Sequence, residues 1–270
     1  MLENMRDVNH LGETLNFGEP GLYVNSNTLR DYAWDYTTQG GRVSAFNDKT
    51  ITEKPFTVVM VADVDTKNRI FEVIEKDVIA QQRGRLYIGD YYLSCYIRGT
   101  AKSDYLASQN YIKITLTVVI DTGRWTKESA LQYLTRTASG STDGMDYPHD
   151  YPIDYAAWLI GGVCIVGGFE AADYRMIIYG ACTNPTVYIG TNTYQINETL
   201  SDGEYMTIDS AAKTITKTAI NGVVTNIYNK RSRANYIFAK IPAGNNAVTW
   251  SGAFGFDLTV YMRRSEPVWT

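Results

Sequence analysis

The sequence predicts an α+β fold in which β structure dominates, and three observations support this prediction. Short runs of β-branched and aromatic residues recur along most of the chain between turns rich in Gly, Asn and Asp. One segment has the periodicity of an amphipathic helix. A stretch rich in Pro, Asp and Gly, residues 138–154, divides the chain, so we expect two domains joined by a linker.

We assign the domains by composition and pattern. Residues 1–137 form an N-terminal β-rich domain with one helix, residues 138–154 the linker, and residues 155–270 a β-sandwich. The chain has 270 residues, of which 44% are hydrophobic and 20% charged. This balance is that of a globular protein that buries a core without needing disulfides or metals to hold it.

The first domain contains the elements with the clearest patterns. Phe56–Ala62 is an expected strand, and Tyr111–Ile120 alternates apolar and polar residues. A helix begins after Asp65 or Thr66 as cap and ends before Gly84. A hairpin turns at residues 89–91, and a second, short helix is expected at residues 127–134. The helix carries one apolar stripe, made by Ile70, Phe71, Val73, Ile74 and Val78.

The second domain reads as β throughout. Asn221-Gly222 between β-branched runs is its clearest hairpin signal. The stretch 156–169 is apolar but too short to span a bilayer, and we expect one or two buried strands there. The other expected strands are Arg175–Tyr179, Thr186–Ile189, Thr193–Ile196, Tyr205–Ile208, Thr214–Lys217, Val223–Tyr228, Tyr236–Lys240, Ala247–Trp250 and Phe256–Met262.

Charge and cysteine usage exclude several function classes. The net charge is −4 and neither half of the chain is basic, so the electrostatic signature of a nucleic-acid or membrane-surface binder is missing. The first residues lack the apolar core of a signal peptide. The three cysteines, Cys95, Cys164 and Cys182, are odd in number and widely spaced. We expect them to be small buried residues of a chain made in a reducing cytoplasm.

Residues suited to catalysis or to metal binding are sparse. The two histidines are His10, near the start, and His149, in the acidic linker, and no G-x-S-x-G motif is present. The sequence therefore predicts no enzyme, no cofactor and no catalytic or metal site. Weak calcium binding by the linker stays an open alternative. The aspartates that would provide its oxygens are Asp143, Asp146, Asp150 and Asp154.

Aromatic residues are the better candidates for a binding role. The chain has 21 tyrosines against 8 phenylalanines, and a tyrosine combines a flat apolar body with one hydroxyl. Trp250 alternates with Val248 as in a strand, which favours a core or interface position. The candidate interface or saccharide contacts are Tyr87, Tyr92, Tyr96, Trp250 and Trp269.

The order of motifs in the second half resembles the C-terminal domain of siphophage distal tail proteins. Residues 175–180 (RMIIYG) are followed by Thr183-Asn184-Pro185, then 202–205 (DGEY), and near the end 241–245 (IPAGN) and Glu266-Pro267-Val268-Trp269. In the first half, the helix followed by 86–92 (LYIGDYY) is similar to the N-terminal belt domain of that family.

The resemblance implies a virion protein of the tail tip. Its N-terminal belt domains would form a hexameric ring that lets DNA pass without specific binding, and its C-terminal galectin-like β-sandwiches would point outward. The implied partners are the tail tube protein, the tail-associated hub protein, and receptor-binding or baseplate proteins. A closed cyclic assembly satisfies a head-to-tail interface without open ends.

A carbohydrate-binding module that recognises the host cell wall is the alternative function. It depends on the galectin-like resemblance and on Trp250. A wall-degrading enzyme is the least favoured interpretation, because the chain lacks a recognisable arrangement of catalytic residues.

Overall fold

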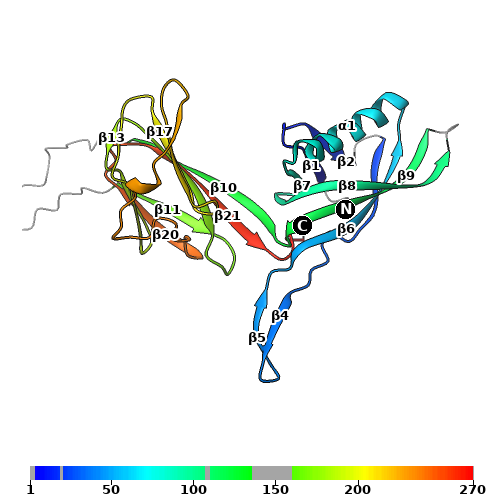
Figure 1. Cartoon of the computed structure of the whole chain (residues 1–270), viewed down its shortest axis with the longest axis horizontal. Helices are drawn as coiled ribbons and strands as arrows, with labels where there is room; N and C mark the ends of the chain where they lie inside the picture. The colour runs from blue at the N-terminus through cyan, green and yellow to red at the C-terminus, as the bar shows by residue number, and fades with distance from the viewer. Residues whose placement is uncertain (1–3, 19–20, 107–109, 136–159, 270) are drawn as a thin grey trace, which may run out of the picture. The chain divides into compact units, whose positions relative to one another are not determined.

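The computed structural model describes residues 4–18, 21–106, 110–135 and 160–269. The chain forms two compact units (Figure 1): unit 1 is Met1–Lys127 with Arg263–Thr270, and unit 2 is Glu128–Met262. Residues 128–135, which we assigned to the first domain, thus group with unit 2. The C-terminal residues from 263 onward group with unit 1. The linker predicted at residues 138–154 lies outside the described residues.

Unit 1 is built on antiparallel strands that meet along one long strand, β8. The first residues of β8 pair with β7, from Tyr91 opposite Ile88 to Cys95 opposite Gly84. From Cys95 onward, β8 pairs instead with β9. The strand orders are therefore β2-β1-β7-β8 and β8-β9-β6-β3. The strands are β1 (Met5–Val8), β2 (Thr14–Phe17), β3 (Leu22–Asn27), β6 (Thr50–Val61), β7 (Gly84–Ile88), β8 (Tyr91–Leu106) and β9 (Tyr111–Thr122).

The alternation read from the sequence places the core of unit 1 correctly. Along β9, every second side chain is at most 5% exposed: Ile112, Ile114, Leu116, Val118 and Ile120. Burying one such aliphatic side chain contributes about 1.5–3 kcal/mol. The intervening residues Lys113, Thr115 and Thr117 are half-buried on the other face. The predicted 85–97 hairpin is also confirmed, with Gly89 in a left-handed conformation (φ 58°) at its turn.

The predicted helix is α1 (Val64–Ala80), but both of its ends differ from the prediction. Asp63 is the N-cap, and its Oδ1 accepts a hydrogen bond from the Thr66 amide at 2.8 Å. Asp65 lies one residue inside the helix. The C-cap is Gln81, in a left-handed conformation (φ 53°), whereas Gly84 already belongs to β7. Gly84 is needed there for space, because a Cβ at this residue would lie 2.2 Å from Oδ2 of Asp77.

The buried face of α1 is only partly the predicted apolar stripe. Ile70, Val73 and Ile74 are buried as expected. Val78 is 42% exposed, and Asp77 is buried in its stead. A buried carboxylate needs hydrogen-bond donors, and His10 provides two of them. α1 is too short and too polar to cross a bilayer.

Unit 2 is a sandwich of two antiparallel sheets, so the predicted mainly β fold is confirmed. One sheet has the order β11-β20-β14-β15 and the other contains β19-β18-β17-β12-β21. Side chains from both sheets share one core, among them Trp250, Met176 and Leu258. The strands are β10 (Trp125–Tyr133), β11 (Ile160–Val166), β12 (Asp173–Tyr179), β13 (Cys182–Thr183), β14 (Thr186–Ile189), β15 (Asn192–Gln195), β16 (Thr199–Leu200), β17 (Tyr205–Asp209), β18 (Thr214–Thr218), β19 (Val224–Asn226), β20 (Gly244–Trp250) and β21 (Phe256–Arg264).

Two sequence predictions in this region are wrong. The helix expected at 127–134 is strand β10, in which Leu131 and Tyr133 face the core and Gln132 faces solvent. The helix-forming composition is overridden by packing. Residues 236–240 form no strand. Their carbonyls are satisfied by tyrosine hydroxyls instead: Tyr174 donates to Ile237, and Tyr194 donates to Ala239 at 2.9 Å.

The apolar stretch 156–169 is described from residue 160 onward, where it is a single strand, β11. This strand is buried on one face only. Cys164 and Val166 face the core, whereas Val163 is 57% exposed and Ile165 61% exposed. The Asn221-Gly222 turn is confirmed between β18 and β19, with Gly222 left-handed (φ 81°).

Candidate functional site

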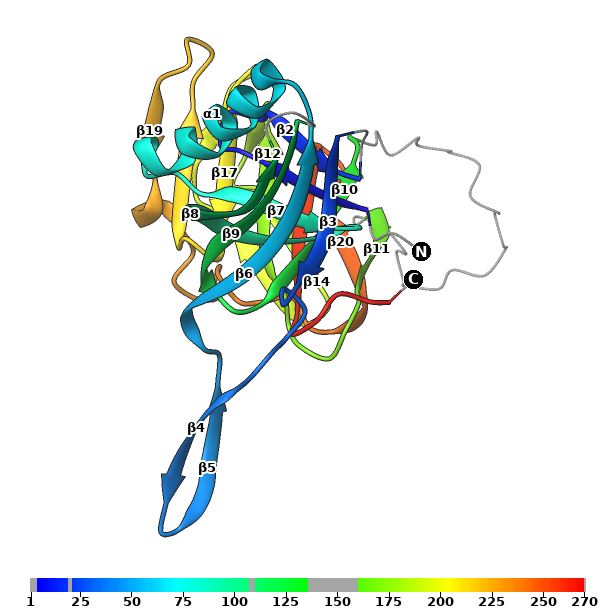
Figure 2. The same ribbon diagram turned by 90° about the vertical axis from the view of Figure 1, so that its right-hand side faces the viewer.

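A two-stranded hairpin extends from unit 1 just before the start of β6 (Figures 1 and 2). It consists of β4 (Asp35–Gln39) and β5 (Arg42–Asn47), and every residue of both strands is exposed. Tyr36 lies directly opposite Phe46, and their side chains are 62% and 65% exposed. An isolated two-stranded hairpin is at best marginally stable in water. Aromatic residues on such a hairpin are therefore expected to pack against another molecule.

The base of this hairpin is held by a cluster of polar and aromatic side chains. Arg124 Nε donates to Asp48 Oδ1 at 2.5 Å, and its guanidinium lies 4.6 Å from the centre of the Trp34 ring. Tyr32 donates from its hydroxyl to Asp48 at 3.2 Å and packs edge-on against Trp34 at 5.0 Å. Arg124 is nearly buried and next to Trp125 of the core, so the cluster ties the hairpin to the body of unit 1.

The chain segment that enters the hairpin is fixed in a second way. Lys54 Nζ donates to the carbonyl oxygens of Leu29 at 2.8 Å and Asp31 at 2.5 Å, and Leu29 is fully buried. Both legs of the hairpin are therefore anchored, and it is positioned by the fold rather than by its own two strands. We call the residues that hold it, Tyr32, Trp34, Asp48, Lys54 and Arg124, the hairpin base.

Trp269, one of the residues singled out in the sequence, lies beside this segment. Its ring is 70% exposed, with the Arg30 guanidinium 3.9 Å from its centre. Arg30 also donates to the carbonyl of Pro267 at 2.9 Å and lies 3.6 Å from Glu266. The C-terminal Glu-Pro-Val-Trp motif is thus a strap that contacts the loop before β4.

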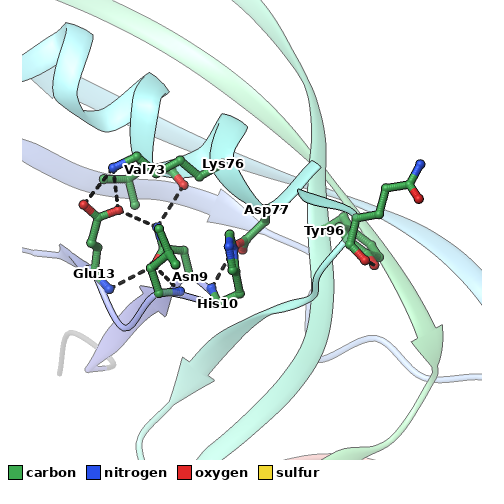
Figure 3. A network of polar contacts seen from close by, with 9 residues as sticks. Asn9, His10, Glu13, Val73, Lys76, Asp77 and Tyr96 are labelled. Atoms are coloured by element: carbon green, nitrogen blue, oxygen red, sulfur yellow. Dashed lines mark hydrogen bonds and ion pairs between the residues drawn. The ribbon is translucent and has the colours of Figure 1, made fainter. Parts of the chain in front are cut away.

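The N-terminal turn of unit 1 is fastened to α1 by a polar network (Figure 3). His10 donates from its backbone amide to Asp77 Oδ1 at 2.8 Å, and its Nδ1 lies 2.6 Å from the same oxygen. Lys76 Nζ donates to both oxygens of Glu13, at 2.8 and 2.9 Å, and Asn9 Nδ2 donates to Glu13 at 2.7 Å. The network orders the turn between β1 and β2.

A groove of about 630 Å³ lies beside this network. Its lining includes Tyr87 and Tyr96, two of the residues singled out in the sequence, together with His10, Arg83 and Arg85. Tyr96 donates from its hydroxyl to the Gln81 carbonyl at 3.0 Å, and Arg83 forms an ion pair with Asp121. The groove is polar, with cationic groups at its wall, and its tyrosines face partly outward.

The other two residues singled out are buried. Tyr92 is 7% exposed and lies under Arg85, whose guanidinium is 4.6 Å from the ring centre. Trp250 is 1% exposed, donates from Nε1 to the Phe254 carbonyl at 3.0 Å, and packs edge-on against Phe256 at 5.4 Å. Trp250 is thus a core residue, the position that its strand alternation favoured, and it does not face solvent as a saccharide contact would.

Two acidic groups and a thiol share the interior of unit 1. Asp7 is 3% exposed, and burial together with the negative charge of Asp77 raises its pKa to about 7. Burial also raises the pKa of Cys95 well above its usual value, with a smaller contribution from the charge of Asp7. Cys95 therefore stays a protonated thiol at neutral pH, which is the opposite of what a nucleophile requires.

The remaining cysteines follow the same pattern. Cys164 is buried in the core of unit 2, and Cys182 is half-buried with a pKa that burial raises to about 11. In the described parts of the chain, no three His, Cys, Asp or Glu side chains are grouped so that they could hold a metal ion. The acidic linker and His149 lie outside those parts.

The hairpin and its base were missed in the sequence analysis. The signal that could have found the hairpin is the Gly40-Gly41 pair, which occupies left-handed conformations (φ 61° and 76°) between two β-rich runs. No comparable signal exists for the hairpin base, because Arg124 and Asp48 are 76 residues apart.

Comparison with solved structures identifies a class of fold. The chain is similar to proteins of phage tail adsorption apparatus, and the predicted resemblance to distal tail proteins is confirmed at the level of fold. One such structure is the SPP1 Dit protein, described as a paradigm of the hub adsorption apparatus in phages that infect Gram-positive bacteria. It has a TM-score of 0.58 and 9% identity, over 96% of this chain and 99% of that chain.

The second group of similar structures comes from the phage P2 baseplate in its activated conformation. A chain of the form with Ca has a TM-score of 0.62 and 9% identity, over 99% of this chain and all of that chain. A chain of the form with Sr has a TM-score of 0.61 and 8% identity over the same shares. No protein-family model matches the sequence, and no curated protein matches it. The similarity is therefore one of fold over the full length.

Proposed function

We propose that this chain is a structural protein of a phage tail tip, in which six copies form a closed ring that joins the tail tube to the adsorption apparatus. The observation that carries the proposal is the β4–β5 hairpin with its anchored base. It presents Tyr36 and Phe46 to solvent on an element that has no core of its own. The full-length similarity in fold to tail hub and baseplate proteins supports the same conclusion.

The hairpin of one copy would pack against the body of the next. Such a contact joins two different surfaces, and repetition about one axis closes it into a ring. The hairpin base fits this role because it fixes the direction of the hairpin before assembly, which reduces the entropy lost on association. DNA would pass through the ring without specific binding, and the net charge of −4 is compatible with a channel that does not hold DNA.

The partners in this proposal are the tail tube protein, the tail-associated hub protein, and receptor-binding or baseplate proteins, all in the virion tail. The chain would perform no catalysis. In support, burial raises the thiol pKa of Cys95 and of Cys164, which disfavours the thiolate that a cysteine nucleophile requires. The carbohydrate-binding alternative loses its main support, because Trp250 lies in the core.

The proposal is tested by the mass of the purified protein in solution and by its place in the particle. Light scattering after size exclusion should give a six-fold assembly for the wild type and a monomer for Phe46→Asp, which puts a charge on the hairpin. Ile220→Asp is the matched control, because Ile220 is 75% exposed and belongs to unit 2, whereas the hairpin belongs to unit 1. A Phe46→Asp variant that assembles like the control would refute the role of the hairpin, and absence of the chain from tail particles would refute the function.

A further inference from the structure

Strand β11 forms one edge of the four-stranded sheet of unit 2, and among the described residues no strand covers its outer side. It pairs with β20 on one side, over the seven residues from Ile160 to Val166. No strand within the described residues pairs with its other side. An edge strand of this length presents a row of backbone groups that can accept a further strand.

The register shows which backbone groups face the open side. The Gly190 amide donates to the Ala247 carbonyl at 2.8 Å, so the backbone groups of Ala247 point toward β14. Val163 is opposite Ala247. In an antiparallel ladder, two opposite residues direct their backbone groups either toward each other or both away from each other. Because the backbone groups of Ala247 point toward β14, the N–H and C=O groups of Val163 point away from β20. The same holds for Gly161 and Ile165.

One of these groups already has a partner. The Val163 carbonyl accepts a hydrogen bond from the Tyr133 hydroxyl at 3.2 Å. The N–H groups of Gly161, Val163 and Ile165 donate to no other group of the described chain. Within the described part of the chain, three donors at the two-residue spacing of a strand are therefore open on this edge.

Among the described residues, β15 at the opposite edge of this sheet is covered and β19 of the other sheet is short, whereas β11 has only the Tyr133 hydroxyl on its outer side. β15 is covered by the loop after η2 (Tyr228–Lys230), since Ile196 bridges to Arg231 and Asn192 Nδ2 donates to the Lys240 carbonyl at 3.0 Å. β19 has only three residues. β11 has the sequence IGGVCIV, without the charge, proline or bulge that commonly blocks an edge.

The side chains beside the open groups are apolar and uncharged. Val163 is 57% exposed, Ile165 61%, and Phe169, just beyond the strand, 99%. The outer face of the sheet continues without charge over Ala247 and Thr249 of β20 and Tyr188 of β14. A charged side chain placed against this surface would lose water without gaining a partner.

We propose that β11 is a docking edge that receives an extended, uncharged strand of another tail-tip protein by β-strand addition. The backbone of the incoming strand would pair with Gly161, Val163 and Ile165, and its β-branched or apolar side chains would cover Val163 and Ile165. The nature of the partner rests on the proposed function. Pairing of β11 with β11 of a second copy does not fit, because it requires a two-fold axis that neighbours in a six-fold ring do not share.

The docking edge is tested by measuring the hydrogen-exchange rates of backbone amides in the isolated chain and in purified tail particles. Amides of residues 160–166 that face the open edge should exchange freely in the isolated chain. In particles they should slow at least about tenfold, which corresponds to about 1.4 kcal/mol. Equal exchange in both states, or protection already present in the isolated chain, would overturn the docking edge. Absence of the chain from the particles would overturn the proposed function, and the inference with it.

Two substitutions at one residue separate backbone pairing from loss of an apolar side chain. Ile165→Pro removes an outward N–H while leaving the pairing with β20, since proline is tolerated on edge strands. Ile165→Thr keeps that N–H. We expect particles made with Ile165→Pro to lose one neighbouring baseplate protein, and those with Ile165→Thr to retain it. Ile165→Lys, a charge on the exposed face, is a second blocking variant should proline disturb the fold. Retention of every neighbour by both blocking variants would contradict the proposal.

Discussion

Replacing Asp7 by asparagine should change how the stability of unit 1 depends on pH. Asp7 is buried on β1, facing the same core as Met5, and its pKa in the folded chain is about 7 against 3.8 in the unfolded chain. Burial is the larger cause, and the charge of Asp77 adds to it. Asparagine has nearly the same shape and does not ionise, so the variant isolates the contribution of this proton.

The direction of this pH dependence follows from whether the folded or the unfolded chain binds the proton of Asp7. Between about pH 4 and pH 7, the unfolded chain has released the proton of Asp7 while the folded chain retains it. The folded state therefore loses stability as the pH rises through this window, and the loss levels off above about pH 7. For these two pKa values, the free energy of unfolding falls by about 2.6 kcal/mol between pH 5 and pH 8. The contribution is fully present below the unfolded pKa.

Urea unfolding of wild type and Asp7→Asn, near pH 5 and near pH 8, measures this difference. The advantage of the variant should grow by about 2–3 kcal/mol from the lower to the higher pH. The transition of unit 2 is an internal control, because Asp7 belongs to unit 1 and its replacement should leave that transition unchanged. An equal difference between the two proteins at both pH values would show that Asp7 does not carry a raised pKa.

Three further predictions concern single contacts. Trp250→Ala should destabilise unit 2 by about 3–5 kcal/mol, since it empties a core position; a loss below about 1 kcal/mol in thermal unfolding would argue against burial of the indole. Gly84→Ala should lower the melting temperature, because its Cβ meets Asp77 Oδ2; a variant as stable as wild type would count against this close approach. Asp63→Ala should cost about 1 kcal/mol by removing the cap of α1, and Asp63→Asn, which keeps an acceptor, should retain most of that stability in urea unfolding.

Local patterns in the sequence were enough for elements whose burial alternates regularly. β9 buries the face that its alternation predicted, and β14 has the predicted bounds. The Asn221-Gly222 turn was identified from its two residues alone. The secondary structure of segments that pair or pack with residues distant in the sequence was not predictable in this way. Residues 127–134 have a helical composition, yet pairing and core packing make them a strand.

The candidate site was predictable only in part, for a related reason. Tyr87 and Tyr96 stood out as strand tyrosines, and both line the groove of unit 1. The contact of His10 with Asp77 spans 67 residues, and that of Arg30 with Pro267 spans 237. A single sequence has no short-range signal for such pairs. An exposed hairpin such as β4–β5 also has no buried face, so the usual core pattern is missing there.

Electron cryo-microscopy of tail tips tests the central claim most directly. We expect a closed ring of six copies of this chain between the tail tube and the adsorption apparatus, with the β4–β5 hairpin of each copy against the next. A tail tip in which this chain is absent, or in which its copies touch without involving residues 35–47, would contradict the account.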